Sequence, residues 1–374
     1  MKKNLFLGVL VFLLSGVMGW AQRQVERPYW FTLEQGKFLF RNGAYGDALM
    51  SFEDARRERK AMYSRMEQDL IAVLSVQEVR RLEDDLNRVE TYIAERYHVY
   101  AAAALRELYY RFPKEKLGNS ATRALEELGR LKDYPEAEYW IGETYRVEGE
   151  LGVALGQYQK AHEQRTFLEN PGFDVEILYK MVDILKVRQE YPEMERRALE
   201  ILVADSLWSG ASGSLTRDAM AGVLEKNGIN RFLTLYRYNN VAVERAHRLL
   251  GFYYYAFGRH SPGPATGHLM FAFLIQNTII IDEIIRSQYD FTFTSMNNLI
   301  QEVLKRPVLV DYIETVEYYK TIYYLAAALY GDGKEERARF FWTFLSSRPD
   351  AGEWNSRAKN QLRKPFLEKG QEMP

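Results

Sequence analysis

The sequence predicts an all-α fold, an α-solenoid of stacked helical hairpins, and three observations support this prediction. Apolar residues recur at spacings of three and four along most of the chain, which is the period of an amphipathic helix. Small and aromatic residues alternate where two short helices would pack closely, most clearly in residues 137–161. Glycine and proline fall between the periodic segments, where a helix has to end.

Residues 1–21 have the pattern of a signal peptide that is removed on export. Two lysines precede an apolar run at 5–17, and Gly19 and Ala21 supply the small residues of a cleavage site. The run is short for a membrane span, and an uncleaved anchor stays the alternative. The chain has no cysteine, which excludes a lipid on an N-terminal thiol, disulfides and thiolate metal ligands. We therefore expect a periplasmic protein that is not a lipoprotein and has no membrane span after signal removal.

The charge balance argues against a polyanionic partner. The chain has 50 Lys and Arg against 51 Asp and Glu, a net charge of -1. Removal of residues 1–21 takes away two lysines and no acid, so 48 against 51 leaves a net charge of -3. Nucleic acid and anionic membranes need a concentrated basic face, so we expect neither as the main partner.

Residues 29–62 form the first predicted hairpin. Gly36 is small where the two helices touch, and a turn follows at Asn42-Gly43. The predicted packing residues of the second helix are Ala48, Phe52 and Ala55. We interpret the run DARRERK at 54–60 as a solvated helix end rather than a functional cluster, because it carries both signs of charge.

Between residues 61 and 112 the hairpin pattern lapses, and apolar residues at helical spacing predict two long inserted helices. A coiled-coil protrusion is less favoured because the heptads are irregular. Whether this segment belongs to the array or projects from it stays open. Pro113 ends the helical pattern, and Asn119 or Ser120 caps the next helix.

Residues 135–168 make the clearest hairpin, with Gly149 at the turn. Its predicted packing residues are Gly142, Tyr145, Ala154, Tyr158 and Ala161. A break at 170–172 precedes a degenerate copy at 175–208. The segment SGASGS at 209–214 is the predicted boundary between an N-terminal array, 22–208, and a C-terminal array, 209–374.

A further hairpin is predicted at 244–280, with Gly251, Tyr254 and Ala272 as packing residues. His260 and His268 lack a third ligand at a supporting spacing, so we assign them no metal. The apolar stretch 278–285 is expected to be a buried helix, and 289–294 an extended connection. Pro307 is expected to end the helix that begins near Asn297.

The last predicted hairpin begins near Tyr319 and ends at Pro349, with Gly331-Asp332-Gly333 at its turn. Its packing residues are Ala326, Ala338 and Trp342. A polar helix at 353–362 is expected to cap the array, and the tail beyond Pro365 to be frayed.

The order in residues 142–161, a small residue, an aromatic three on, a turn, then Ala-x-x-x-Tyr-x-x-Ala, resembles the tetratricopeptide repeat. The resemblance implies 34-residue units, a right-handed superhelix, and a concave face that binds proteins through the second, fifth, ninth and twelfth positions of each repeat. The partner-binding residues so implied are Trp30, Lys37, Phe40, Tyr139, Glu143, Arg146, Arg245, Arg248, Phe252, Tyr255, Tyr323 and Tyr330. The Lys and Asn pattern with which some members bind a C-terminal carboxylate is absent.

The resemblance implies a non-enzymatic scaffold or adaptor of the bacterial envelope, such as the periplasmic collar of a flagellar motor. The alternatives are a cell-wall-active lytic enzyme, a periplasmic partner of a transporter, and a carrier of a lipophilic ligand. No Walker loop, dinucleotide glycine fingerprint, HExxH or Gly-x-Ser-x-Gly occurs, and neither does the Glu-Ser pair of lytic transglycosylases. We therefore assign no catalytic, cofactor-binding or metal-ligating residue.

Overall fold

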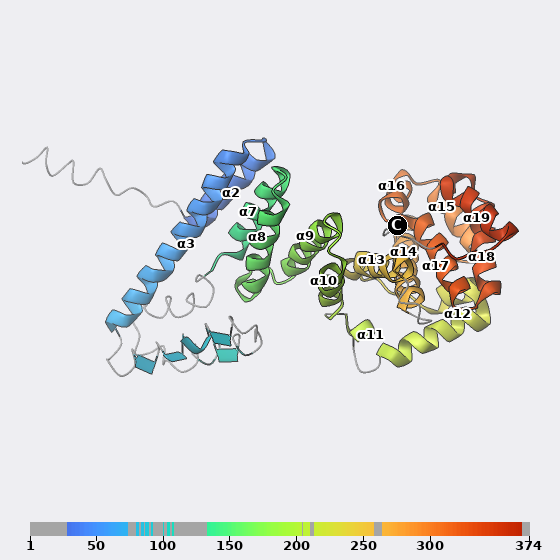
Figure 1. Ribbon diagram of the computed structural model, residues 1–374, viewed down its shortest axis with the longest axis horizontal. Coiled ribbons are helices and arrows are strands. Elements are labelled where there is room, and N and C mark those ends of the chain that lie inside the picture. Colours follow the sequence, from blue (N-terminus) through green and yellow to red (C-terminus); the bar gives the residue numbers. More distant parts are fainter. Residues whose placement is uncertain are drawn as a thin grey trace, which may run out of the picture. The chain divides into compact units, whose positions relative to one another are not determined.

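Every regular element that the computed structural model describes is a helix (Figure 1). The described parts of the chain are residues 28–73, scattered residues between 80 and 107, and residues 133–203, 205–209, 213–257 and 264–368. The prediction of an all-α fold is therefore confirmed.

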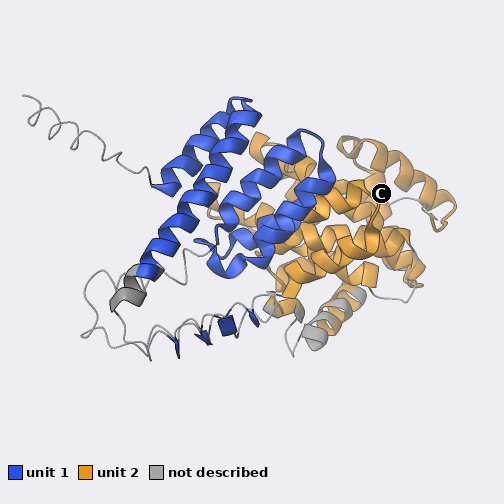
Figure 2. Cartoon of the chain, turned by 60° about the vertical axis from the view of Figure 1, so that its left-hand side comes forward, with its two compact units in different colours: residues 1–180 blue, residues 181–374 orange. Residues whose placement is uncertain are grey.

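The chain forms two compact units, Met1–Lys180 and Met181–Pro374 (Figure 2). The division falls inside one helix, whereas the sequence placed a boundary at 208/209. That expectation rested on the small residues of 209–214. The helix at Tyr191–Val203 packs against the helix at Val241–Ala256, which joins it to the later part of the chain.

In the described part of unit 1, two helical hairpins are followed by the start of a third. Its elements are α2 (Tyr29–Arg41), α3 (Tyr45–Val73), α7 (Pro135–Val147), α8 (Leu151–Glu163), the 3-10 turn η2 (Arg165–Phe167) and the first part of α9 (Phe173–Val187). Helices α2 and α3 pack as one hairpin and α7 and α8 as the next, and α3 also packs against α7. The helix α3 runs unbroken past the expected end of the hairpin at residue 62.

Glycine allows the close approach of helices in both hairpins of unit 1. A Cβ atom on Gly36 would lie 2.5 Å from the ring of Phe52, and one on Gly142 would lie 2.9 Å from the ring of Tyr158. Both rings are fully buried. The turn between α7 and α8 uses Gly149 at φ +86, a backbone conformation that costs glycine little.

Unit 2 repeats the arrangement of hairpins. It begins within α9, and its further elements are α10 (Tyr191–Val203), α11 (Ser206–Ser209), α12 (Gly213–Leu235), α13 (Val241–Ala256), α14 (Pro264–Ser287), α15 (Met296–Val303), α16 (Pro307–Thr315), α17 (Tyr318–Gly331), α18 (Glu335–Ser346), the 3-10 turn η3 (Pro349–Ala351) and α19 (Glu353–Arg363). The helix α10 packs against α13, α14 against α17, and α18 against α19. The second helix of each hairpin therefore contacts the first helix that follows it.

Most of the residues predicted to pack between helices are buried. The fully buried ones are Ala48, Phe52, Ala55, Ala154, Tyr158, Ala161, Ala272, Ala326, Ala338 and Trp342, and the glycines Gly36, Gly142 and Gly251 are buried as well. Tyr145 and Tyr254 are half-buried. The Tyr254 hydroxyl donates to Glu195 Oε1 at 2.8 Å, so this side chain ends in a polar contact rather than in the core.

Several segments differ from expectation. The long helix α12 was not predicted, and it contains a kink at Gly228, where φ is 75 and ψ is 177. Pro307 does not end a helix: α15 stops at Val303, and Pro307 opens α16, where its missing N–H and fixed φ suit the first turn. The stretch 289–294 is a connection between helices, but it begins with a turn at residues 289 and 290 that was predicted as extended.

Residues 278–285 lie in α14, which confirms the predicted buried helix. By length and composition, α14 is the one helix among the described residues that is apolar enough to cross a membrane, but 78% of its most apolar window is buried inside the protein. A helix that is hydrophobic all round is typical of a protein core as well as of a membrane span.

Some expectations fall outside the described residues. These are the signal peptide at 1–21, most of the inserted helices at 61–112, the helix after residue 120, much of the segment 209–214, and His260.

Candidate functional site

Four basic side chains gather on the first helices of successive hairpins in unit 2. Lys186 lies in the last turn of α9, Arg245 and Arg248 are three residues apart on α13, and Lys320 is near the start of α17. Positions three apart lie on one side of a helix, so the two arginines project together. We name these four residues the basic cluster.

Glu317 joins two members of the basic cluster. Its carboxylate accepts hydrogen bonds from Arg248 and from Lys320, whose Nζ is 2.7 Å from Glu317 Oε1. Burial opposes its ionisation, but these two cations outweigh burial and lower its pKa. Glu317 adopts a left-handed backbone with φ 49, which costs a non-glycine residue about 1 kcal/mol. The residue with the strained backbone is therefore the one whose carboxylate joins Arg248 to Lys320.

Lys186 is the member of the basic cluster whose positive charge is least compensated by nearby carboxylates. Among the described residues, no carboxylate lies within ion-pair distance of its ammonium group. Burial, and then repulsion from Lys320 and Arg248, lowers its pKa. Among the described residues, Asp183 pairs with Arg245, and Glu244 and Glu317 pair with Arg248.

Glu244 forms the buried edge of the cluster. Its Oε1 accepts from Arg248 Nε at 3.1 Å and from Gln276 Nε2 at 2.7 Å. Burial raises the pKa of Glu244 against the opposing effect of Arg248. The Gln276 amide also donates to the Val316 carbonyl at 3.0 Å, which connects α14 to the end of α16. The basic cluster is thus connected through Glu244 to a buried polar network.

The structure separates the twelve implied partner-binding residues into two groups. Five are buried in the protein and are not available to a partner in this structure: Tyr139, Glu143, Phe252, Tyr255 and Tyr323. The others are half-buried or exposed: Trp30, Lys37, Phe40, Arg146, Arg245, Arg248 and Tyr330. The buried aromatic rings fill space between neighbouring helices. A large side chain on a first helix can contact the next hairpin as well as the solvent.

The resemblance-based count missed Lys186, although the signal was present in the sequence. The count was made on four hairpins and not on the degenerate copy at 175–208. From residue 175, the ninth and twelfth positions are Asp183 and Lys186. Both lie beside the arginines of α13, so the weak copy supplies part of the cluster.

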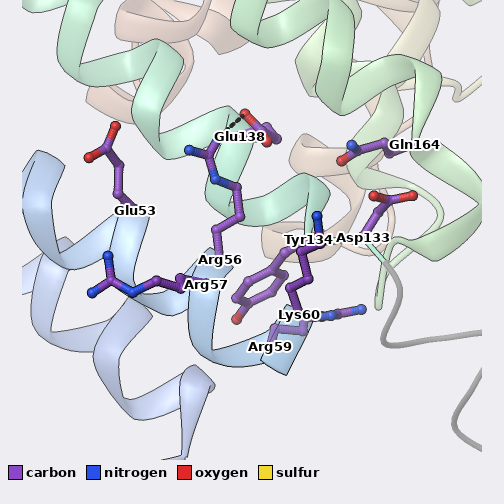
Figure 3. Close-up of a pocket in the computed structure, with 9 residues that line it drawn as sticks. All are labelled: Glu53, Arg56, Arg57, Arg59, Lys60, Asp133, Tyr134, Glu138 and Gln164. Carbon is purple, nitrogen blue, oxygen red and sulfur yellow. Dashed lines mark hydrogen bonds and ion pairs between the residues drawn. The ribbon is translucent and has the colours of Figure 1, made fainter. Parts of the chain in front are cut away.

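Unit 1 contains an open pocket of about 480 Å³ (Figure 3). The side chains that line it are Glu53, Arg56, Arg57, Arg59, Lys60, Asp133, Tyr134, Glu138 and Gln164. Arg56 Nη1 bonds both carboxylate oxygens of Glu138, at 2.9 and 3.2 Å. Arg59 is 1% exposed, and its guanidinium lies 4.3 Å from the centre of the Tyr134 ring. The interpretation of DARRERK as a solvated helix end therefore does not hold for Arg59.

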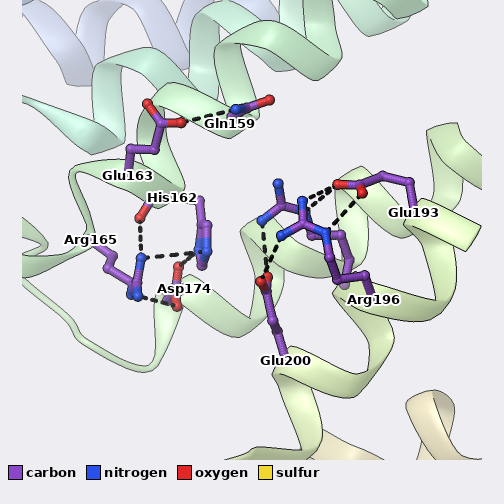
Figure 4. Close-up of polar contacts among 9 residues, drawn as sticks. Gln159, His162, Glu163, Arg165, Asp174, Glu193, Arg196 and Glu200 are labelled. Atoms are coloured by element: carbon purple, nitrogen blue, oxygen red, sulfur yellow. Dashed lines mark hydrogen bonds and ion pairs between the residues drawn. The ribbon is translucent and has the colours of Figure 1, made fainter. Parts of the chain in front are cut away.

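Two further polar clusters consist of mutually paired groups (Figure 4). In unit 1, His162 Nδ1 lies 2.6 Å from Asp174 Oδ1. In unit 2, Arg196 bonds Glu193 and Glu200 on successive turns of α10. The carboxylates of Asp174, Glu193 and Glu200 already pair with side chains of their own cluster, so we assign these clusters no ligand.

His268 is buried beside a second histidine that the sequence did not single out. The two Nδ1 atoms of His247 and His268 are 3.0 Å apart, and His247 Nε2 is 3.7 Å from Asp205 Oδ2. Trp208 packs over both imidazole rings. Within the described residues, no three His, Cys, Asp or Glu side chains are arranged to hold a metal ion.

The chain is similar to two bacterial proteins. An uncharacterized protein of Treponema pallidum is 22% identical over 336 residues, which cover 89% of each chain. An uncharacterized protein of Borreliella burgdorferi is 21% identical over 238 residues, 59% of this chain and 73% of the relative. No family model matches the chain, and no solved structure matches it significantly. The first likeness spans nearly the whole chain, so it includes both units.

Substitution of Glu143 tests whether this implied partner-binding residue is buried in the protein, as the structure shows. Its carboxylate accepts from Arg146, Tyr158 and Lys180, with Lys180 Nζ at 3.1 Å. Burial opposes its ionisation, but these donors outweigh burial and hold its pKa below the ordinary value. We expect Glu143→Ala to lower the free energy of unfolding by about 2 kcal/mol at pH 7.

The same substitution has a pH signature. A carboxylate with a depressed pKa stabilises the fold above its unfolded pKa, and this contribution is lost as pH falls through the folded pKa. The difference between wild type and Glu143→Ala should therefore shrink in acid, measured by urea unfolding across pH 3–7. The exposed Glu148→Ala is the control, and an equal effect of both variants would place Glu143 on an open surface.

Proposed function

We propose that this chain is a non-enzymatic scaffold or adaptor that holds other proteins in the bacterial envelope. The observation that carries the proposal is the basic cluster, which brings four cationic side chains together on the first helices of successive hairpins. Arg245 and Lys186 are partly accessible there, and arginine is among the residues that contribute most at protein interfaces. The partner face is an acidic protein surface that complements this charge.

The finer form of the proposal is a tetratricopeptide-like α-solenoid in the periplasm. The order of hairpins, in which a second helix contacts the following first helix, supports it, as does the signal-peptide pattern of residues 1–21. Within the envelope, the periplasmic collar of a flagellar motor is the assembly that we favour. This choice rests on the resemblance stated above.

The test is crosslinking in living cells, followed by affinity purification and mass spectrometry. We expect reproducible recovery of one envelope assembly with the wild-type chain, and recovery lowered about tenfold with Lys186→Glu combined with Arg245→Glu. The expected size follows from reversing charges at an electrostatically complementary interface, where like-charge contacts cost several kcal/mol. The unfolding transition of the variant should stay close to that of wild type, because the Arg245 pair is half-exposed.

A matched control is Arg286→Glu combined with Lys305→Glu. It makes the same charge change in unit 2 at side chains that are 73% and 65% exposed and lie outside the cluster. Equal recovery with both double variants would overturn the basic cluster as the partner-binding surface. Release of soluble fragments from peptidoglycan by the purified chain would overturn the non-enzymatic role.

A further inference from the structure

The C-terminal segment folds back onto unit 2 instead of fraying after Pro365. Gln361 on α19 is fully buried and makes a reciprocal pair with the backbone of Phe366. Its Nε2 donates to the Phe366 carbonyl at 3.1 Å, and its Oε1 accepts from the Phe366 N–H at 2.9 Å. The Glu368 N–H then donates to the Tyr255 hydroxyl on α13 at 3.3 Å.

The carboxylate of Glu368 is bound by two side chains. Arg357 on α19 donates to it, and so does the hydroxyl of Tyr323 on α17. The Arg357 guanidinium also lies over aromatic rings, 4.7 Å from the centre of Tyr323 and 4.8 Å from the centre of Trp354. A guanidinium held against rings is partly desolvated, which strengthens its attraction for a carboxylate. We name Tyr255, Tyr323, Arg357 and Gln361 the tail site.

The tail site binds backbone groups and a carboxylate, and it covers two apolar side chains in part. Phe366 is 50% exposed and Leu367 is 45% exposed, so about half of each apolar side chain is buried. The polar contacts that hold it are two backbone N–H groups, a backbone carbonyl and one carboxylate. Any extended segment with an acid two residues after the paired backbone group offers the same atoms.

We propose that the tail site is a peptide-docking site that the chain's own C-terminal segment occupies in cis. Its other occupant is a partner segment with two apolar residues followed by a glutamate, in the pattern of Phe366, Leu367 and Glu368. Binding of the partner displaces the tail, which makes the cis contact autoinhibitory. Only the identity of the occupant as a partner protein rests on the proposed function. The tail site lies on α13, α17 and α19, separate from the residues of the basic cluster.

The test uses the full chain and a fluorescent synthetic peptide with the sequence of residues 364–374. Fluorescence anisotropy reports binding. We expect Glu368→Gln in the chain to tighten peptide binding about tenfold relative to wild type, since the variant weakens the charge-assisted bonds of the cis competitor. Adding Arg357→Gln to this variant should abolish the gain, and a peptide carrying glutamine in place of Glu368 should bind weakly to every chain.

The matched control is Glu368→Gln combined with Arg363→Gln, because Arg363 is an exposed arginine on the same helix. It should bind like Glu368→Gln alone. If Arg357→Gln prevents folding, Tyr323→Phe replaces it, since it removes only the hydroxyl. The proposal is overturned if wild type and Glu368→Gln bind the peptide equally, or if Arg357→Gln leaves binding unchanged. A dimer in light scattering that Glu368→Gln dissociates would assign the site to a second copy and overturn the partner assignment. None of these outcomes alters capture through the basic cluster.

Discussion

Gly251→Ala is expected to lower the free energy of unfolding of unit 2 by about 2 kcal/mol, although alanine is the better helix former. A Cβ atom at this position would lie 2.5 Å from Leu269 Cγ and 3.2 Å from the Leu269 backbone nitrogen. Leu269 is fully buried, so it has no open space to move into. The helix-propensity gain of about 1 kcal/mol is therefore smaller than the overpacking cost of about 1–3 kcal/mol plus the displacement of α14.

The matched control for this substitution is Gly222→Ala on α12. Among the described residues, no atom beyond its chain neighbours and the local helix backbone lies within 4 Å of the position that its Cβ would take. Only the propensity term applies there, so we expect a gain of up to about 1 kcal/mol. Denaturant unfolding of both variants measures the difference. A stabilised Gly251→Ala would show that α13 and α14 are not in close contact at this point.

Arg248→Ala is expected to lower the free energy of unfolding by about 3 kcal/mol at neutral pH. The substitution leaves Glu244, which is 5% exposed, without its cation, and it removes one of two cations from Glu317. Breaking a buried ion pair by removing one partner leaves an uncompensated charge, which costs about 3–5 kcal/mol when burial is complete. Gln276 still donates to Glu244, and this places the expected loss at the lower end.

The loss should depend on pH, and its sign follows from Glu244. Burial raises its pKa even with Arg248 present, and removing the arginine raises it further. A group whose folded pKa is raised favours the fold below its unfolded pKa, and this contribution is lost as pH rises through the folded pKa. The loss in Arg248→Ala should therefore be largest at pH 7, shrink as pH falls through the raised folded pKa of Glu244, and be smallest below about pH 4.3, the ordinary value for glutamate.

The control for this experiment is Arg245→Ala on the same helix. Its ion pair with Asp183 is 43% exposed on both sides, so we expect a change of less than about 1 kcal/mol. The two variants are compared by thermal unfolding at pH 4 and pH 7. Equal, small effects at both positions would mean that Arg248 is as accessible as Arg245 and belongs to an open face.

Local spacing was sufficient to predict the hairpins. Gly36, Phe52, Gly142 and Tyr158 were predicted to pack between the helices of their hairpins. In the structure Gly36 faces the ring of Phe52, and Gly142 faces the ring of Tyr158. The reason is that a hairpin is a short-range object, whose two helices and turn lie within about 34 residues. Prediction failed where one residue is compatible with two structures. A proline such as Pro307 can follow the end of one helix or occupy the first turn of the next.

The candidate site was predicted only in part, for a related reason. Arg245 and Arg248 were identified from their repeat positions, but the count could not distinguish them from Phe252 and Tyr255, which occupy equivalent positions and are buried. Burial of a first-helix residue depends on the side chains that the following hairpin supplies.

The sequence by itself determined the helical class, most hairpins and the residues at which their helices touch, because these follow from periodicity and side-chain size over short distances. Only the tertiary structure decided that Lys186 joins two arginines and a lysine, that Glu244 is buried beneath them, and that Glu368 returns to Arg357. These features depend on contacts between helices far apart in the chain, where the charge and volume of one side chain are balanced by another that no local pattern specifies.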